Sequence, residues 1–199
     1  MFPKDAITET PIHPALAQRW SGRAFDPNRA VEAKTLIQLF EAARWSPSAS
    51  NQQPWRLTVW DRNEDFQQWS RAFECLTGFN RTWACHAPLL MLAAAETASS
   101  EGKPNRWAPY DCGAAMMSLS VEATALGLMV HQMGGFDRLA IQQAFELPES
   151  VEPMSILAVG YQLPEGLIPQ DLMEREFAER TRKPLESLIF KGSWGRPFR

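Results

Sequence analysis

The sequence has few of the features that mark secreted, membrane or nucleic-acid-binding proteins. Its three cysteines (Cys75, Cys85 and Cys112) are odd in number and widely spaced, which favours reduced thiols over a disulfide framework. The longest apolar run, residues 87–95, contains a proline and is about half the length of a membrane span. Lys and Arg total 20 against 23 Asp and Glu, so the chain lacks the basic excess of a general nucleic-acid binder.

The N-terminus, the histidines and the missing motifs narrow the possible classes further. Met1–Asp5 lacks the charged-then-apolar pattern of a secretory signal, so we expect a cytoplasmic protein. His13, His86 and His131 stand in unrelated contexts and no Cys-x-x-Cys occurs, so we expect no metal site. The chain also lacks a phosphate-binding P-loop, a Gly-x-Gly-x-x-Gly fingerprint and a Gly-x-Ser-x-Gly elbow. We therefore assign no catalytic side chain, and an enzyme of this sequence needs a bound cofactor for its chemistry.

Tryptophan is what the sequence has in excess, with eight residues against only two tyrosines. Its large flat side chain serves hydrophobic cores, interfaces and ring-stacking sites alike. Composition alone does not choose among these three uses.

Proline and glycine divide the chain into short helices and strands, which we interpret as one α+β domain over residues 1–199. The predicted helices are 14–20, 32–46, 63–76 (capped by Asn63), 109–126 and 137–145, from helical spacing and capping residues. The predicted strands are 55–60, 88–95, 128–132 and 154–160. We expect residues 97–107 to form an exposed excursion and the chain from about 164 to form an irregular, extended tail.

A basic cluster near the N-terminus is the first candidate binding site. Arg19, Ser21 and Arg23 alternate with Trp20 and Gly22, so two guanidinium groups and a hydroxyl could converge on one dianionic phosphate. The alternative is a solvated basic turn. A late basic stretch, 180–183, either joins this cluster or forms an exposed face.

The polar loop 46–55 is the second candidate, because it joins a predicted helix to a predicted strand. Its serine, asparagine and glutamine side chains lie between Pro47 and Pro54, which restrict the backbone. Donors and acceptors held in fixed directions suit a polar heteroaromatic ligand. The alternative is a turn that satisfies its own backbone groups.

Two further segments could approach a flat ligand. Asn80 could make paired hydrogen bonds to a ring carbonyl and a ring N–H, or it could cap a helix. The segment 131–137 ends a predicted strand and begins a helix, and its two glycines allow a ligand to come close to the backbone. The alternative for the second segment is a plain strand-to-helix turn.

In their order along the chain and in their residues, these segments resemble those of the FMN-dependent nitroreductases. The matching pieces are Arg19–Phe25, Ala42–Trp55, Phe79–Asn80, Gly127–Leu128 leading to Gly134–Asp137, Leu147–Glu149 and Ala158–Tyr161. They span most of the chain, and the piece from Ala42 to Trp55 is the most specific. The resemblance implies a nitroreductase-like α+β fold with a mixed central sheet of about four to five strands surrounded by helices. It also implies an intertwined homodimer that binds FMN at its interface and takes electrons from NADH or NADPH.

Carried over by position, the resemblance implies three groups of FMN contacts. Those to the phosphate and ribityl chain are Arg19, Trp20, Ser21, Arg23 and Arg180 or Arg182. Those around the cofactor, partly from the second subunit, are Pro47, Ser48, Ala49, Asn51 and Gln53. Those along the flavin ring are Asn80, Trp83, Gln132, Met133, Gly134 and Gly135. Trp20 and Trp83 depart from the family, since other members carry basic residues at these two places.

The activity implied by the resemblance is a ping-pong reaction in which NAD(P)H reduces FMN and FMN reduces a small, electron-poor substrate. Nitroaromatics, quinones and enones fit a pocket walled by Phe79, Trp107 and Tyr110. We expect the small-residue helix 109–126 at the dimer interface, unless it packs within one subunit. Two alternatives are a specialised oxidative or dehalogenating flavin enzyme of the same fold and a non-catalytic flavin-binding dimeric protein. We expect neither a nucleic-acid nor a membrane partner.

Overall fold

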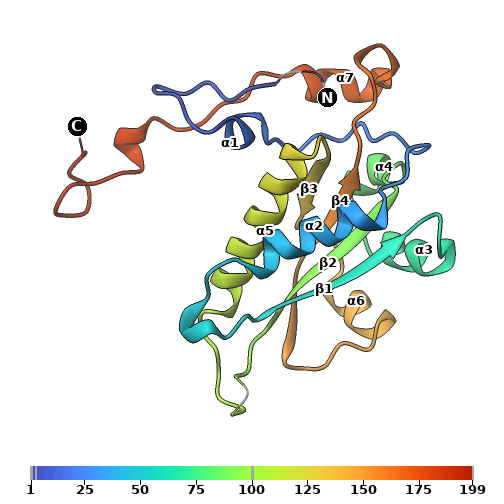
Figure 1. Cartoon of the computed structure of the whole chain (residues 1–199), viewed down its shortest axis with the longest axis horizontal. Helices are drawn as coiled ribbons and strands as arrows, with labels where there is room; N and C mark the ends of the chain where they lie inside the picture. Colours follow the sequence, from blue (N-terminus) through green and yellow to red (C-terminus); the bar gives the residue numbers. More distant parts are fainter. Residues whose placement is uncertain (1, 3, 100, 199) are drawn as a thin grey trace.

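The structure is a computed structural model that describes residues 2, 4–99 and 101–198. Its helices are α1 Pro14–Gln18, α2 Ala33–Arg44, α3 Phe66–Glu74, α4 Asn80–Ala84, α5 Ala108–Ala125, α6 Arg138–Ala144 and α7 Gln170–Phe177. Its strands are β1 Trp55–Asp61, β2 Leu89–Glu96, β3 Met129–Met133 and β4 Val151–Gly160 (Figure 1). Short 3-10 turns cover Ala49–Asn51, Glu165–Leu167 and Leu185–Ser187. All the helices and strands predicted from the sequence are present, and α4 and α7 were not predicted.

The strands form one sheet in the order β1-β2-β4-β3. Each described strand pair is antiparallel, so the mixed sheet that we expected is wrong for this chain. The reason lies in the connections. Asp61 at the end of β1 pairs with Leu89 at the start of β2, so the connection between these strands leaves and re-enters the sheet at the same end of the two strands. A parallel pair would need a connection that crosses the whole length of the sheet.

Hydrophobic residues cover both faces of the sheet. On one face α2 and α5 pack against alternate residues of β2 and β4, such as Leu89, Met91 and Leu157. On the other face α3, α4 and α6 pack against Leu90, Leu92 and Ile156. β2 is buried at every position from 89 to 95, as expected for an inner strand that is covered on both sides.

The local caps explain where the helices begin and end. The α3 helix starts after Asp65, whose side chain accepts a hydrogen bond from the Gln68 N–H; the predicted cap, Asn63, is therefore wrong. The α5 helix ends before Gly127, which has a left-handed φ of 76°. Glycine adopts that conformation without steric cost, as in many helix ends.

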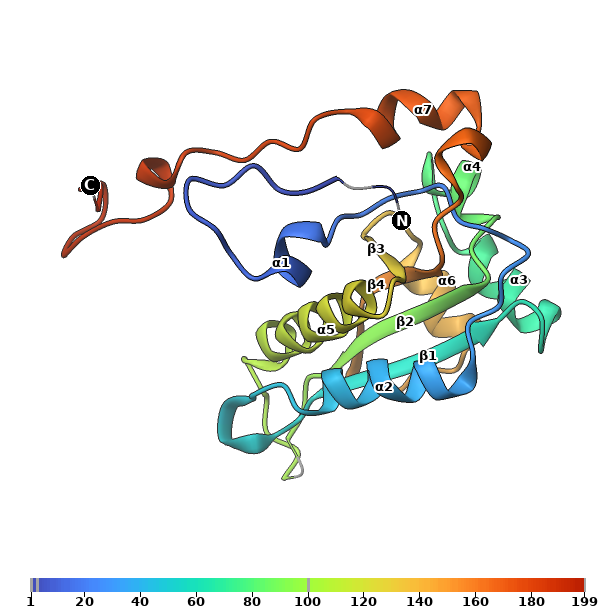
Figure 2. The same ribbon diagram turned by 45° about the horizontal axis from the view of Figure 1, so that its top comes forward.

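The two ends of the chain run side by side above α5 in both views (Figures 1 and 2). The Lys4 ammonium donates hydrogen bonds to the carbonyl oxygens of Arg175 and Glu176. The Arg180 guanidinium donates to the carbonyl oxygens of Lys4, Ala17 and Arg19. After α7 the chain is extended and reaches away from the sheet. Within the described ranges, no helix combines the length and the apolar character that crossing a bilayer requires.

Candidate functional site

The segment 19–24 follows α1 as an extended chain outside the regular helices and strands. Successive side chains of an extended segment point to opposite sides. Accordingly, Ser21 and Arg23 are partly exposed, whereas Trp20 and Ala24 are buried with 6% and 1% of their surfaces accessible. The predicted convergence of Arg19, Ser21 and Arg23 on one side therefore agrees with the backbone, and an Arg19 Nη1 atom lies 3.4 Å from Ser21 Oγ.

Trp20 faces the interior, unlike its neighbours Arg19 and Ser21. Its ring is buried in the core, with the Lys4 ammonium 4.3 Å from the ring centroid and Phe2 packed at 5.8 Å. The Trp20 side chain therefore does not face outward with those of Arg19 and Arg23, and its assignment as an FMN contact stays a prediction. The physical reason is the alternation itself, because a residue between two exposed neighbours faces the interior.

Positive charge accumulates beside this segment. Burial lowers the pKa of Arg19, and the nearby guanidinium groups of Arg180 and Arg182 lower it further. Arginine nevertheless stays protonated near neutral pH. The Asp5 carboxylate opposes the lowering of the Arg180 pKa and so offsets part of this positive charge. A cluster of guanidinium groups is a good receptor for a phosphate.

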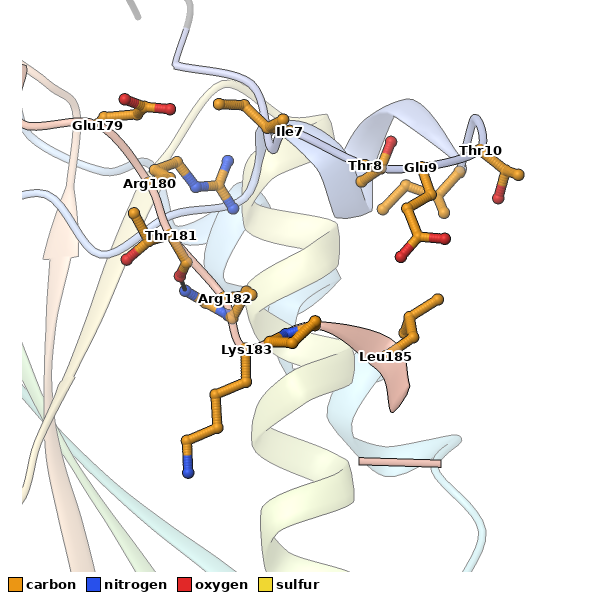
Figure 3. Close-up of a pocket in the computed structure, with 12 residues that line it drawn as sticks. Ile7, Thr8, Glu9, Thr10, Glu179, Arg180, Thr181, Arg182, Lys183 and Leu185 are labelled. Atoms are coloured by element: carbon orange, nitrogen blue, oxygen red, sulfur yellow. Dashed lines mark hydrogen bonds between the residues drawn. The ribbon is translucent and has the colours of Figure 1, made fainter. Parts of the chain in front are cut away.

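Arg180 does join the Arg19 segment, which was one of the two alternatives for the late basic stretch. Its guanidinium donates to Arg19 O at 2.8 Å and thereby fixes the backbone where the segment begins. Arg180 and Arg182 also line a cavity of about 480 Å³ between residues 7–12 and 179–185, in which Figure 3 shows both side chains. Arg182 donates a hydrogen bond to the neighbouring Thr181 carbonyl, and its side chain is exposed beside the cavity.

A second part of the site lies where α4 begins and β3 ends. The Asn80 side-chain N–H group donates to Gly135 O at 3.2 Å, and the Thr77 N–H donates to the same oxygen at 3.0 Å. A Cβ atom on residue 135 would lie 2.7 Å from Asn80 Nδ2, so this approach requires glycine there. Asn80 and the glycine pair are thus brought together, as the sequence predicted.

Phe79 connects this second part to the basic segment. Its ring, 41% exposed, has the Arg175 guanidinium at 4.4 Å and the Arg23 guanidinium at 5.9 Å from its centroid. A flat, exposed ring between two cations is suited to stacking against a ligand. The predicted wall residue Phe79 therefore borders the same surface as Arg23.

The predicted flavin-ring contacts from α4 and β3 divide by their exposure. Gly134 is exposed, and no atom lies within 4 Å of the position of a Cβ there. The Gln132 amide nitrogen lies 3.2 Å from Ser120 Oγ on α5. Trp83 and Met133 are buried, with 0% and 2% exposure, so their side chains belong to the core. Within this chain neither side chain lines an exposed surface, and the assignment of these two residues as FMN contacts stays a prediction.

The loop 46–53 forms a separate group at the N-terminal end of α5. Ser46 Oγ lies 2.8 Å from Ser118 Oγ, the Ala49 N–H donates to Asp111 Oδ2 at 3.0 Å, and the Gln53 N–H donates to Ser48 Oγ at 3.0 Å. Three loop residues have left-handed backbone angles, with φ of 50° at Ser50, 55° at Asn51 and 47° at Gln53. Non-glycine residues in this region persist only where surrounding contacts hold them.

Trp107 and Tyr110 lie beside this loop rather than beside Phe79. Their rings meet edge to face, with centroids 6.4 Å apart, and are 47% and 75% exposed. Trp107 lines a small surface cavity together with Ala49, Ser50 and Gln52. The three predicted wall residues therefore do not form one pocket within this chain.

The two groups of predicted site residues lie toward opposite ends of α5. This helix has 18 residues and is therefore about 27 Å long. Figures 1 and 2 place the loop 46–53 at its N-terminal end and the segment after α1 toward its other end. A single chain does not bring the basic segment and the loop together.

Three residues beside the site were missed or left without a role. Glu176 on α7 accepts a hydrogen bond from the Arg23 N–H at 2.7 Å, His131 Nδ1 lies 3.0 Å from Gly22 O, and Asp111 binds the loop backbone. Burial lowers the pKa of His131 to about 4 and raises the pKa of Glu176. No sequence signal pointed to Glu176, because its partner is 153 positions away and α7 was not predicted.

Solved structures and curated proteins resemble this chain over most of its length. A crystal structure of an oxidoreductase containing FMN is 32% identical, with a TM-score of 0.88 over 98% of this chain and 99% of that one. A protein of Archaeoglobus fulgidus, whose name gives it as an inferred NADH dehydrogenase/NAD(P)H nitroreductase, is 25% identical over 84% of this chain and 90% of its own length. A protein of Desulfovibrio desulfuricans, solved in complex with FMN, shares the fold at 22% identity, with a TM-score of 0.73 over 94% of this chain and 99% of that one.

The nitroreductase family profile matches residues 16–77 and 71–161, which is more than half of the chain. The α+β nitroreductase-like fold that the motifs implied is thereby confirmed. The chain belongs to the nitroreductase family.

Proposed function

We propose that this protein is an FMN-dependent oxidoreductase that takes electrons from NADH or NADPH. The observation that carries the proposal is the outward side of the segment 19–23, where the partly exposed side chains of Arg19, Ser21 and Arg23 lie together. The FMN-containing relative at 32% identity and the NAD(P)H-linked names of other relatives support the same cofactor and donors.

The residues present fit the phosphate of FMN. Arg23 Nε is buried and has no hydrogen-bond partner among the described residues, so one guanidinium donor awaits an acceptor. Arg19 and Ser21 add a charged and a neutral donor on the same side of the chain. The glycines 134 and 135 leave the backbone at the end of β3 open to a flat ring.

When bound, FMN supplies the redox chemistry by accepting a hydride from NAD(P)H and passing two electrons to a second substrate. The side chains of this protein bind and orient. Arg19, Ser21 and Arg23 hold the phosphate, Asn80 fixes the Gly135 carbonyl, and Phe79 offers a stacking face. We propose a ping-pong order with a small, electron-poor second substrate such as a nitroaromatic, a quinone or an enone.

We further propose a homodimer in which the loop 46–53 of one chain completes the site of the other. The loop lies toward the far end of α5 from the basic segment, so a partner is needed to unite the predicted contacts. Tyr110, Gly113 and Met117 are exposed on α5 at helical spacing and form a largely apolar face that a second copy can cover. The exposed apolar tail residues Leu188 and Trp194 add surface for the same contact.

The first test is the visible spectrum of the purified protein before and after anaerobic addition of NADH or NADPH. We expect a flavin spectrum, or one that appears after addition of FMN, and bleaching by at least one donor. Failure to take up FMN would overturn the proposal, and bound FMN that neither donor bleaches would favour a non-catalytic flavin protein. Parallel lines in double-reciprocal plots with a quinone or nitroaromatic test the ping-pong order, whereas consumption of donor without either reduced product favours a specialised enzyme.

Sedimentation at micromolar concentration tests the dimer separately. A complementation experiment then tests the shared site: mixing Arg19→Ala subunits with Gln53→Ala subunits should restore some activity, since one mixed site carries neither substitution. A monomer, or no restoration in a proven mixed dimer, would contradict the shared site. The single domain and the cytoplasmic location expected from the sequence stay predictions.

A further inference from the structure

Among the described residues, no strand pairs with the backbone groups of residues 20–23 in the segment 19–24. Buried backbone N–H and C=O groups in native proteins are nearly always paired, so partners must come from elsewhere. Two of them are side chains. His131 Nδ1 lies 3.0 Å from Gly22 O, and Glu176 Oε1 accepts from the Arg23 N–H at 2.7 Å. These two anchors lie on adjacent residues, between the Ser21 and Arg23 side chains that face outward.

The His131 contact fixes which ring nitrogen carries the proton. A carbonyl oxygen only accepts hydrogen bonds, so Nδ1 must donate to Gly22 O. Because burial keeps the pKa of His131 near 4, the ring is neutral at ordinary pH and its proton is on Nδ1. The ring is held in place by Trp83, whose centroid lies 4.5 Å away. His131 is thus a rigid donor mounted on β3.

Glu176 approaches the same segment from the opposite element. Its residue is fully buried, its Oε1 binds the Arg23 N–H, and its Oε2 has no partner among the described residues. Burial raises its pKa, while the Arg23 and Ala24 backbone groups and the charges of Arg23 and Lys4 oppose that rise. A buried carboxyl group is costly, and an apolar residue would pack α7 at lower cost. The contact that offsets this cost is the hydrogen bond from the Arg23 N–H, which gives the carboxyl a role beyond packing.

Both anchors act on the part of the backbone that directs the phosphate ligands. Loss of either would free the peptide between Gly22 and Arg23 to rotate, and an extended segment then turns its side chains away from their common side. We propose that His131 and Glu176 are positioning residues that hold Arg19, Ser21 and Arg23 in register for the phosphate of FMN. They thereby set the preference of the protein for FMN over riboflavin. This inference rests on the proposed function.

The test compares the dissociation constants of the apoprotein for FMN and for riboflavin, which lacks the phosphate, by quenching of flavin fluorescence. The ratio of the two constants isolates the phosphate site, since riboflavin binding reports the ring site alone. We expect Glu176→Leu and His131→Phe to lower the preference for FMN about tenfold or more and to change riboflavin binding by less than about twofold. Arg19→Ala should behave in the same way because it removes a phosphate ligand directly.

The conservative variants separate positioning from packing. Glu176→Gln keeps an acceptor and His131→Asn keeps a donor near the position of Nδ1, so both should retain most of the preference. Glu174→Leu, on the exposed side of the same helix, is the matched control and should leave the ratio unchanged. If Glu176→Leu or His131→Phe lacks the wild-type circular dichroism spectrum, Glu176→Ala and His131→Ala replace them with the same expectation.

The dissociation constants for FMN and riboflavin distinguish failure of the positioning role from failure of the proposed cofactor. Equal loss of FMN and riboflavin binding in the variants, or a ratio within about twofold of wild type, overturns the positioning role. Wild-type protein that binds both flavins equally overturns this inference and leaves the proposed cofactor standing. Wild-type protein that binds neither flavin overturns the proposed function and the inference with it.

Discussion

The buried imidazole of His131 should make the stability of the protein depend on pH in a window that one substitution removes. Burial lowers the folded-state pKa of His131 from its ordinary 6.5 to about 4. Between these values the unfolded chain binds a proton that the folded chain does not. Stability contributed by the neutral ring is therefore fully present above pH 6.5 and is lost progressively as the pH falls toward 4.

The magnitude follows from the two pKa values. At pH 5 the linkage relation gives a loss of about 2 kcal/mol, and the full loss below pH 4 is about 3 kcal/mol, at about 1.4 kcal/mol per pKa unit. The assay is urea unfolding at pH 7.5, 6 and 5, at one protein concentration, for the wild type and for His131→Asn, which cannot titrate. The difference between the two free energies of unfolding should change by about 2 kcal/mol from pH 7.5 to pH 5. Glu176 and the other carboxyl groups titrate in both proteins and cancel. Parallel curves for the two proteins would refute the reasoning.

Three further predictions concern packing and loop anchoring. Gly160→Ala should lower the free energy of unfolding in urea by about 1–3 kcal/mol, because its Cβ would lie 2.7 Å from the rigid Pro88 ring. The control Gly166→Ala meets nothing within 4 Å and should be nearly neutral, so equal effects would contradict this reasoning. Trp83→Ala should lower the free energy of unfolding by about 3–5 kcal/mol in the same measurement, since the Trp83 ring is fully buried. A loss below about 1 kcal/mol would contradict this burial. Asp111→Ala should lower the free energy of unfolding by about 1–3 kcal/mol and speed proteolysis of the loop 46–53, because it removes the acceptor of the Ala49 N–H. Asp111→Asn keeps an acceptor and should do neither. A stable, protease-resistant Asp111→Ala protein would show that the loop needs no such anchor.

The helices and strands were predictable where their signals are local. Helical spacing, a glycine after α5 and a continuous apolar run in β2 depend on neighbouring residues alone. The order and direction of the strands were not predictable, because they follow from pairs such as Asp61 with Leu89 that lie far apart in sequence. The α7 helix was missed because it buries only Leu172 and Glu176, too few apolar positions for a periodic signal.

The site was predictable to the level of its segments but not of each side chain. Trp20 and Met133 lie in extended chain, where alternation sends them into the core while their neighbours face outward. Trp83 is buried because it packs against Phe25 and His131, and the five-residue helix α4 is too short to show a clear periodicity. Glu176 and Asp111 act on backbone groups of distant segments, and no local pattern in the sequence encodes such a contact.

The two halves of the proposed site are organised before any ligand arrives. The left-handed conformation of three residues within the loop 50–53 costs about 1–3 kcal/mol each, and the Asp111 and Ser48 contacts hold it. The segment 19–24 is held in the same manner by His131 and Glu176. Each half therefore loses little conformational entropy on binding. What remains adjustable is the placement of one half relative to the other, and in the proposed dimer the subunit interface sets that placement. Substitutions on the exposed face of α5 should accordingly change flavin affinity without touching either half.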